Sequence, residues 1–340
     1  MNLGPRRVVA DVDTGIDDAC ALSWLAGTGG VELMACTTVS GNTTAELAAR
    51  NTAAVLDACG VNDVPVVVGN TVPREVPLVT TPETHGPTGL GHAHVPERPD
   101  RIADADFLEV WRDALDAPPE GYAGAIVPPT TLLLTGPLTN LADALDRDPD
   151  LVEHFDQIVI MGGSFDHPGN TTDRAEWNTW CDPHAAARVY EYFTGRPEAD
   201  LPIVCGLDIT ETVEMHPAHL RGYCSSAGVP EPRLRPGEVE EYECRLPVLT
   251  LLVNALQFYF QFHLDHDGQY IVHVHDLLAA VLIGGRVTFE TESVGVHVGI
   301  EGDARGATEI TPAPAAARRV THVDSGAVFV DWGRALRSFR

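Results

Sequence analysis

The sequence contains no lysine, because all 22 of its basic residues are arginine. Acidic residues outnumber them, 49 to 22, and the formal net charge is −27. Such a charge repels nucleic acids, anionic membranes and polyphosphates, so we expect no nucleic-acid and no membrane partner. A neutral or cationic small molecule is a better match. The lysine-free, acidic composition is typical of a high-GC genome or of salt adaptation, and it does not separate the two.

Paired cysteines and long apolar runs are also missing. The seven cysteines are an odd number, lie far apart and include no CxxC pair, which is typical of reduced, buried thiols. No segment approaches the ~18 consecutive apolar residues of a membrane span. The chain passes from Arg6 directly into its first apolar run, without a signal-like region. We therefore expect a soluble, cytoplasmic protein.

The order of the apolar runs predicts the fold class. Strand-like runs alternate with helical stretches such as the alanine-rich segment 45–59. This alternation favours an open, mainly parallel, doubly wound α/β sheet with helices on both faces, in which ligands collect at the carboxyl ends of the strands. No internal repeat is present, so we expect a single domain over 1–340. Strands are predicted at 7–12, 31–39, 64–68, 126–135, 157–161, 202–206 and 272–274, and a late helix at 247–263.

The stretch DVDTGIDD, which begins at Asp11, holds four aspartates within eight residues. If residues 7–12 form a buried strand, Asp11 and Asp13 alternate out of its carboxyl end, and a glycine permits the tight turn that follows. The next helix then starts at Asp17-Asp18, where acidic side chains contribute only about 0.3–1 kcal/mol. This does not offset the repulsion among four carboxylates, so the cluster must raise some pKa values or hold a cation. An all-oxygen donor set favours Ca²⁺ or Mg²⁺.

Two enzyme families carry an acidic motif of this kind after their first strand. The haloacid dehalogenase-type phosphatases use DxDx(T/V), but this chain has Gly15 where that pattern needs Thr or Val, and it lacks the lysine that steadies a phosphoryl group. DVDTGIDDACAL instead resembles the DxDPGxDDAxA signature of the inosine-uridine-type nucleoside hydrolases. The one departure is Thr14 in place of proline, which costs a rigid φ but no ligand.

Further motifs similar to those of the nucleoside hydrolases follow in order, so that the resemblance spans about residues 8–311. A loop resembling HGxDGLG has Thr88 where aspartate is usual, and a segment resembling the ribose-binding GN...EFN has Trp177 in place of phenylalanine. One carboxylate and two carboxamides on the latter loop supply the donors and acceptors that vicinal hydroxyls need. The matched residues outside the first motif are His85, Thr135, Asn170, Glu176, Asn178, His275 and Asp276.

The resemblance implies a specific site. Its metal ligands for Ca²⁺ would be Asp13, Asp18, the backbone carbonyl of Thr135, and Asp276. The residues expected to hold ribose are Asp17, Asn42, Asn170, Glu176 and Asn178. His85 either contacts the substrate or is a structural loop histidine. Asp13 is the predicted general base for a metal-bound water, and His275 is the candidate for protonating or hydrogen-bonding the leaving base.

These residues predict calcium-dependent hydrolysis of the N-glycosidic bond of ribonucleosides in nucleoside salvage, giving ribose and a free base. Two alternatives remain: a ribohydrolase for a modified or natural-product nucleoside, and a non-catalytic protein that binds nucleosides or calcium. The resemblance also implies a homodimer or homotetramer. The sequence assigns no role to His273, and the aromatic residues of the helix predicted at 247–263 favour core or subunit contacts over contact with a base.

Overall fold

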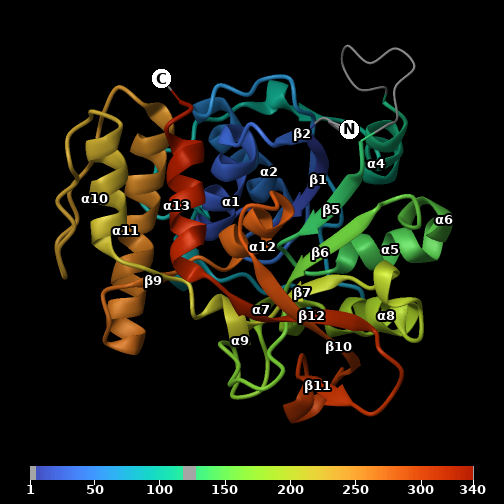
Figure 1. The fold of residues 1–340 in the computed structure, drawn as a ribbon. Coiled ribbons are helices and arrows are strands. Elements are labelled where there is room, and N and C mark those ends of the chain that lie inside the picture. Colours follow the sequence, from blue (N-terminus) through green and yellow to red (C-terminus); the bar gives the residue numbers. More distant parts are fainter. Residues whose placement is uncertain (1–4, 118–127, 340) are drawn as a thin grey trace.

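The protein has one large twisted sheet with helices on both faces (Figure 1). The computed structural model describes residues 5–117 and 128–339, so the predicted strand start at 126–127 lies outside the described residues. Within those ranges, the sheet consists, from one edge to the other, of β11 (Thr308–Thr311), β10 (Phe289–Val298), β12 (Ala317–Val323), β7 (Ile203–Cys205), β6 (Gln157–Met161), β5 (Thr130–Leu134), β1 (Arg6–Val12), β2 (Val31–Thr38), β3 (Val66–Val68) and β4 (Ile102–Ala103).

The sheet is parallel from β12 to β4, and β10 runs antiparallel to both of its neighbours, β11 and β12. The predicted fold class, a mainly parallel doubly wound α/β sheet, is confirmed. The strand β1 lies between β2 and β5. From β1 the chain adds β2, β3 and β4 on one side, and it then adds β5, β6 and β7 on the other side. A crevice forms at the carboxyl ends of the strands where the winding changes direction.

Two groups of helices bury the two faces of the sheet, on opposite sides of it in Figure 1. One group packs α1 (Ile16–Gly27), α2 (Ala45–Ala58), α11 (Pro247–Asp267), α12 (His275–Ile283) and α13 (Ser325–Leu336). The other packs α4 (Phe107–Asp116), α5 (Thr139–Arg147), α6 (Pro149–Val152) and α8 (Pro183–Phe193). The remaining α-helices and strands of the described residues are α3 (Pro82–His85), α7 (Trp177–Cys181), α9 (Leu207–Thr210), α10 (Pro217–Ser226), β8 (Glu214–Met215) and β9 (Val272–His273).

The helices α1 and α12 are buried almost all round. Every residue of α12 is buried, as are the residues of α1 from Ile16 to Leu25. A helix that is apolar on all sides belongs in the interior, and these two pack against each other. Because both begin in the crevice, the acidic residues of their first turns are held there by two fully packed helices.

The structure differs from the predicted elements mainly in irregular regions. The predicted helix 247–263 continues to Asp267, where Gly268 ends it with φ of 70°. Residues 71–101 and 211–245 fall between the predicted elements; the first stretch contains the short helix α3, and the second contains β8 and α10. In the described part of the chain, no helix combines the length and the apolar character needed to cross a membrane.

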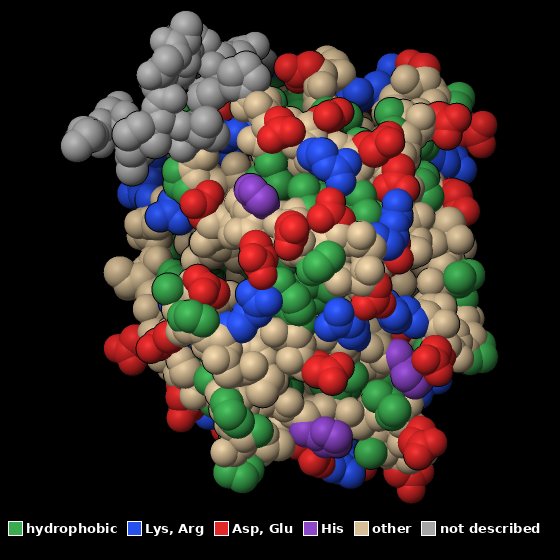
Figure 2. Space-filling model, turned by 90° about the vertical axis from the view of Figure 1, so that its right-hand side faces the viewer, with side chains coloured by type: hydrophobic (Ala, Val, Ile, Leu, Met, Phe, Trp, Pro, Cys, Tyr) green, Lys and Arg blue, Asp and Glu red, His purple; other side chains and the backbone are tan. Residues whose placement is uncertain are grey.

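On the face that Figure 2 shows, charged side chains are spread out rather than gathered in one patch. Figure 2 shows acidic side chains across the face formed by α4, α5 and α8, with arginines between them. Arginine pairs with aspartate here, as in Arg112–Asp148 and Arg188–Asp146, both at 2.8 Å. Exposed pairs of this kind each contribute only about 0–1 kcal/mol, so they add little to the stability of the fold.

Candidate active site

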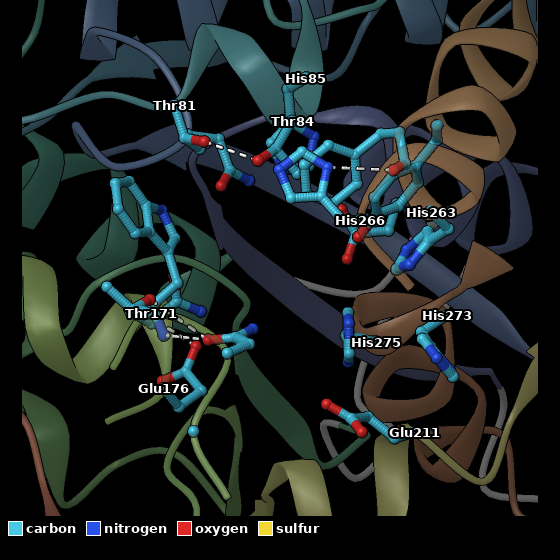
Figure 3. A pocket seen from close by; sticks show the side chains of 18 of the residues that line it. Thr81, Thr84, His85, Thr171, Glu176, Glu211, His263, His266, His273 and His275 are labelled. Carbon is cyan, nitrogen blue, oxygen red and sulfur yellow. Dashed lines mark hydrogen bonds between the residues drawn. The ribbon is translucent and has the colours of Figure 1, made fainter. Parts of the chain in front are cut away.

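A pocket of about 680 Å³ opens at the carboxyl ends of the central strands (Figure 3). Its lining comes from segments that follow four strands: Asp17 after β1, Asn42 after β2, Thr135 after β5 and Met161 at the end of β6. All the residues predicted to bind substrate line it, namely Asp17, Asn42, His85, Asn170, Glu176 and Asn178. The pocket therefore gathers segments that lie far apart in the sequence.

Three buried carboxylates meet at the base of the pocket. Oxygens of Asp17, Asp18 and Asp276 lie within 4.8 Å of one another. Burial, followed by the charge of Asp18, raises the pKa of Asp17 to about 7. Burial also raises the pKa of Asp276 well above its usual range, with the charge of Asp17 adding to it. A cation would relieve this repulsion.

Asp13 lies beside this group and is fixed by its neighbours. Asn42 donates to both of its carboxylate oxygens, from the backbone N–H at 2.7 Å and from Nδ2 at 3.2 Å. A Cβ at Gly41 would lie 2.1 Å from Asp13 Oδ2, so only glycine leaves room for the carboxylate. Burial, then the charge of Asp18, raises the pKa of Asp13 well above its usual range. Of the predicted metal ligands, Asp18 and Asp276 belong to the close group of three, and Asp13 stands next to it.

Gly15 begins α1 in the middle of the site. Its φ of −90° is one that other residues adopt, so the turn does not depend on the backbone freedom of glycine. A Cβ there would lie 2.6 Å from both Asn42 Nδ2 and His85 Nδ1. Close packing, rather than the turn conformation expected from the sequence, is the physical reason for glycine here.

Thr135, directly after β5, forms a hydrogen bond with the acidic group. Its hydroxyl donates to Asp18 Oδ1 at 2.6 Å, and its backbone carbonyl accepts a hydrogen bond from Asn178 Nδ2 at 2.7 Å. A carbonyl oxygen has two lone pairs, so one remains available for a cation. This contact also holds Asn178 beside Thr135, whose hydroxyl bonds to Asp18.

Glu176 holds the loop that covers the other side of the pocket. Its carboxylate accepts hydrogen bonds from the backbone N–H groups of Gly163 (2.9 Å), Asn178 (2.7 Å) and Thr179 (3.0 Å). It thus caps α7 and joins it to the turn after β6. Asn170, which is exposed, accepts from the backbone N–H of Trp177 at 2.9 Å. Glu176 and Asn170 thus stabilise the same loop through hydrogen bonds at two different positions.

His85 and His275 are both buried in the pocket wall. The ring of His85 accepts a hydrogen bond at Nδ1 from the first N–H of α1, on Ile16, at 3.1 Å. Burial lowers the pKa of His85 to about 3, so the ring is neutral. His275 Nδ1 lies 2.8 Å from Thr210 Oγ1, and burial, followed by nearby His273, lowers its pKa well below the usual value. Each ring keeps its other nitrogen for a further partner.

Comparison with known proteins assigns the chain to a protein family. The model of the family described as inosine-uridine preferring nucleoside hydrolase matches residues 8–330. The chain belongs to this family. It is therefore an enzyme, a glycosidase that acts on N-glycosidic bonds, and the resemblance noted in the sequence is confirmed.

Individual nucleoside hydrolases agree with this assignment. Uridine nucleosidase 1 of Arabidopsis thaliana is 31% identical over 280 residues, which cover 82% of this chain and 74% of that protein. The inosine-uridine preferring nucleoside hydrolase of Leishmania major is 30% identical over 299 residues, covering 88% and 85%. Among solved structures, the purine-preferring ribonucleoside hydrolase of Gardnerella vaginalis has a TM-score of 0.78 at 23% identity, covering 97% of this chain and 98% of that one, which shows a shared fold.

The pocket of this nucleoside hydrolase also contains residues that the sequence does not reveal. Tyr259, Phe262, His263 and His266 line it from one side of α11, and Glu211 lies nearby. Their i, i+3, i+4, i+7 spacing places them on one helix face. The sequence favours core or subunit contacts for this helix, and the signal against that interpretation is the pair of histidines within an otherwise apolar stripe.

Proposed function

We propose that this nucleoside hydrolase cleaves the N-glycosidic bond of ribonucleosides in a calcium-dependent reaction, releasing ribose and the free base. The observation that carries the proposal is the single pocket in which buried carboxylates, amides and imidazoles meet. Two relatives point the same way, because one is named for uridine and another for inosine and uridine.

The residues present fit a calcium ion. The acidic group offers only carboxylate oxygens, the ligands that Ca²⁺ prefers. When bound, Ca²⁺ supplies positive charge that makes a neighbouring water more acidic. The residues proposed to hold it are Asp13, Asp18, the carbonyl of Thr135, and Asp276.

Asp13 is proposed as the general base. In hydrolysis, a water oxygen bonds to C1′ of the ribose, the C1′–N bond breaks with its electrons going to the base, and the water loses a proton. Asp13 is proposed to receive that proton, because Asn42 holds its carboxylate in one orientation beside the acidic group. The surrounding carboxylates stabilise the positive charge that develops on the sugar.

The remaining predicted residues are proposed to bind the two parts of the substrate. Asp17, Asn42, Asn170, Glu176 and Asn178 would hold the ribose hydroxyls, with His85 in the wall beside them. His275 is proposed to donate a hydrogen bond to the departing base. Its neutral ring carries one N–H, and this N–H is on Nε2 when Nδ1 accepts a hydrogen bond from the Thr210 hydroxyl.

A ribose-release assay on inosine, guanosine, adenosine, uridine and cytidine tests the function. We expect free ribose from at least one of them and loss of activity after chelation, with recovery on adding calcium. Full activity in verified metal-free protein would contradict the calcium requirement. Calcium binding without cleavage of any common nucleoside would instead favour a modified nucleoside as substrate or a binding role alone.

A further inference from the structure

One segment of the pocket wall depends on contacts made outside the pocket. The segment 81–91 contains α3 and contributes His85 to the wall (Figure 3). The Thr81 N–H donates to the Asn42 carbonyl at 3.1 Å, and the Ile16 N–H donates to the His85 ring, also at 3.1 Å. Because His85 accepts at Nδ1, the proton of its neutral ring is on Nε2. The position of this N–H therefore depends on how the segment 81–91 is attached to its surroundings.

One carboxamide connects this segment to the aspartate turn, residues 11–18. Asn51 lies in α2 and is 1% exposed. Its Nδ2 donates to the backbone carbonyl of Thr14 at 3.0 Å and to that of Thr88 at 2.8 Å. A carboxamide NH₂ group has two protons, so each carbonyl receives one of them. The same side chain thus binds both the turn that carries the buried aspartates and the segment that carries His85.

The aspartate turn has a second bond to α2. Thr52 Oγ1 donates to the Ala48 carbonyl at 2.8 Å, so Thr14 is the donor in the 2.6 Å contact between the two threonine hydroxyls. Both hydroxyls belong to fully buried residues. Proline, which is usual at position 14 in this family, fixes φ but cannot make such a bond. The turn therefore stays attached to α2 when the Asn51 carboxamide is removed.

Gly89 brings the segment 81–91 into direct contact with Asn51. Its φ of 89° lies in the left-handed region that glycine adopts freely. A Cβ at this position would lie 2.7 Å from Asn51 Nδ2 and 3.3 Å from the Thr14 carbonyl oxygen. The backbone of the segment thus packs on the carboxamide itself, and glycine is the residue that permits this approach.

We propose that Asn51 is a positioning residue for substrate binding, because it joins Thr88 to the aspartate turn and so holds the His85 ring at the pocket wall. Asn51 is not among the described residues that line the pocket, so it acts through His85. The inference rests on the proposed function. Loss of the carboxamide weakens substrate binding more than catalysis, since the Thr14–Thr52 bond and the bonds from Asn42 to Asp13 remain.

The first test is the kinetics of Asn51→Leu, which keeps a branched side chain but removes both hydrogen bonds. On the ribonucleoside that the wild type cleaves best, we expect KM to rise about tenfold and kcat to fall less than about threefold. A merely structural role would instead reduce the active fraction, which lowers kcat and leaves KM unchanged. An unchanged KM in folded Asn51→Leu would overturn the inference.

Asn254→Leu is the matched control. Asn254 is 8% exposed and also donates from Nδ2 to two backbone carbonyls, those of Tyr242 and Thr250, each at 2.8 Å. Neither Asn254 nor these two partners is among the described residues that line the pocket. Both variants should lose stability in urea denaturation, but only Asn51→Leu should raise KM. An equal rise in KM in Asn254→Leu would contradict a specific role of Asn51.

A double-mutant cycle tests whether Asn51 acts through His85. In a His85→Ala background, adding Asn51→Leu should change KM by no more than about twofold, because the ring that the carboxamide positions is already absent. Effects on KM that simply multiply would show that the two residues act independently. That result would overturn the inference.

Hydrogen exchange gives a readout that does not depend on activity. Peptides spanning 81–91 should exchange their amide protons faster in calcium-loaded Asn51→Leu than in the wild type or in Asn254→Leu. Unchanged exchange would overturn the inference. If Asn51→Leu fails to fold, Asn51→Ser replaces it, since one short hydroxyl cannot donate to both carbonyls, and the same rise in exchange and in KM is expected.

The two proposals fail in different ways. If the wild type releases ribose from none of the ribonucleosides, the proposed function fails, and hydrogen exchange still decides whether Asn51 holds the segment 81–91. Ribose release by the wild type together with an unchanged KM in Asn51→Leu would overturn this inference alone.

Discussion

At the scale of single residues, the proposed role of His275 is to help the base leave. His275 is buried and neutral, with one nitrogen engaged by Thr210. We expect His275→Ala to lower kcat by about 10²–10⁴-fold for nucleosides whose base needs help to leave. An aryl riboside such as p-nitrophenyl riboside, whose leaving group is stable as an anion, should be cleaved at nearly the wild-type rate. Equal losses on both substrates would contradict the role in leaving-group activation.

The residues around the aspartate cluster could be identified from the sequence because they lie in ordered motifs at strand ends. Asp18 and Asp276 lie in one group with Asp17, and Asp13 lies beside Asp18, since parallel strands bring their carboxyl ends to one edge of the sheet. His263 and His273 could not be identified in this way. Their rings approach to 5.1 Å only because α11 packs beside β9, and no local pattern encodes that contact.

At the scale of elements, the loop before α7 depends on one buried side chain. Glu176 accepts hydrogen bonds from three backbone N–H groups. In Glu176→Ala those donors lose their partner, so we expect the free energy of unfolding to fall by about 1–3 kcal/mol. Urea denaturation measures this change. Glu191→Ala, at an exposed position of α8, is the control and should unfold like the wild type, and equal stability of the two variants would contradict the capping role.

Element boundaries show where sequence patterns stop being informative. The apolar periodicity of α11 fades after His263, yet the helix continues for another turn until Gly268, whose positive φ ends it. A glycine after a helix is a readable stop signal, and it defines this end better than hydrophobicity does. Within 71–101, by contrast, α3 has only four residues, too few for a periodic pattern to emerge.

At the scale of the whole molecule, the acidic cluster couples stability to pH and to metal. The pKa of Asp17 is about 7 in the folded protein, against 3.8 as its ordinary value. A carboxyl that binds its proton more tightly when folded stabilises the protein at low pH, and this contribution is lost as pH rises from about 4 to about 7. We therefore expect chelator-treated protein to have a lower Tm at about pH 8 than at about pH 5.5.

Thermal scans with chelator and with calcium at both pH values measure this effect. Calcium should reduce the difference between the Tm at about pH 5.5 and the Tm at about pH 8, because it binds the ionised carboxylates of the folded state. Asp276→Asn removes one charge from the cluster and should show a smaller difference without metal. The same difference in calcium-loaded and metal-free protein would contradict the link between the cluster and the ion.

The strand order of the sheet also indicates how many domains the chain forms. Strand β12, near the end of the chain, pairs with β7 in the same sheet that contains β1. We propose that residues 1–340 form one domain, and expect a single unfolding transition at which circular dichroism and tryptophan fluorescence coincide. Two separated transitions would contradict it. The homodimer or homotetramer expected from the sequence stays a prediction, which light scattering on the purified protein can test.

The central claim is that Asp13 activates water for cleavage of a ribonucleoside. Its most direct test is ribose release by calcium-loaded wild type and Asp13→Asn, on the nucleoside that the wild type cleaves best and at matched, measured calcium content. We predict release by the wild type, and a rate about 10²–10⁴-fold lower in a variant that keeps the wild-type circular dichroism spectrum. A folded, calcium-loaded Asp13→Asn protein that releases ribose at nearly the wild-type rate would contradict the account.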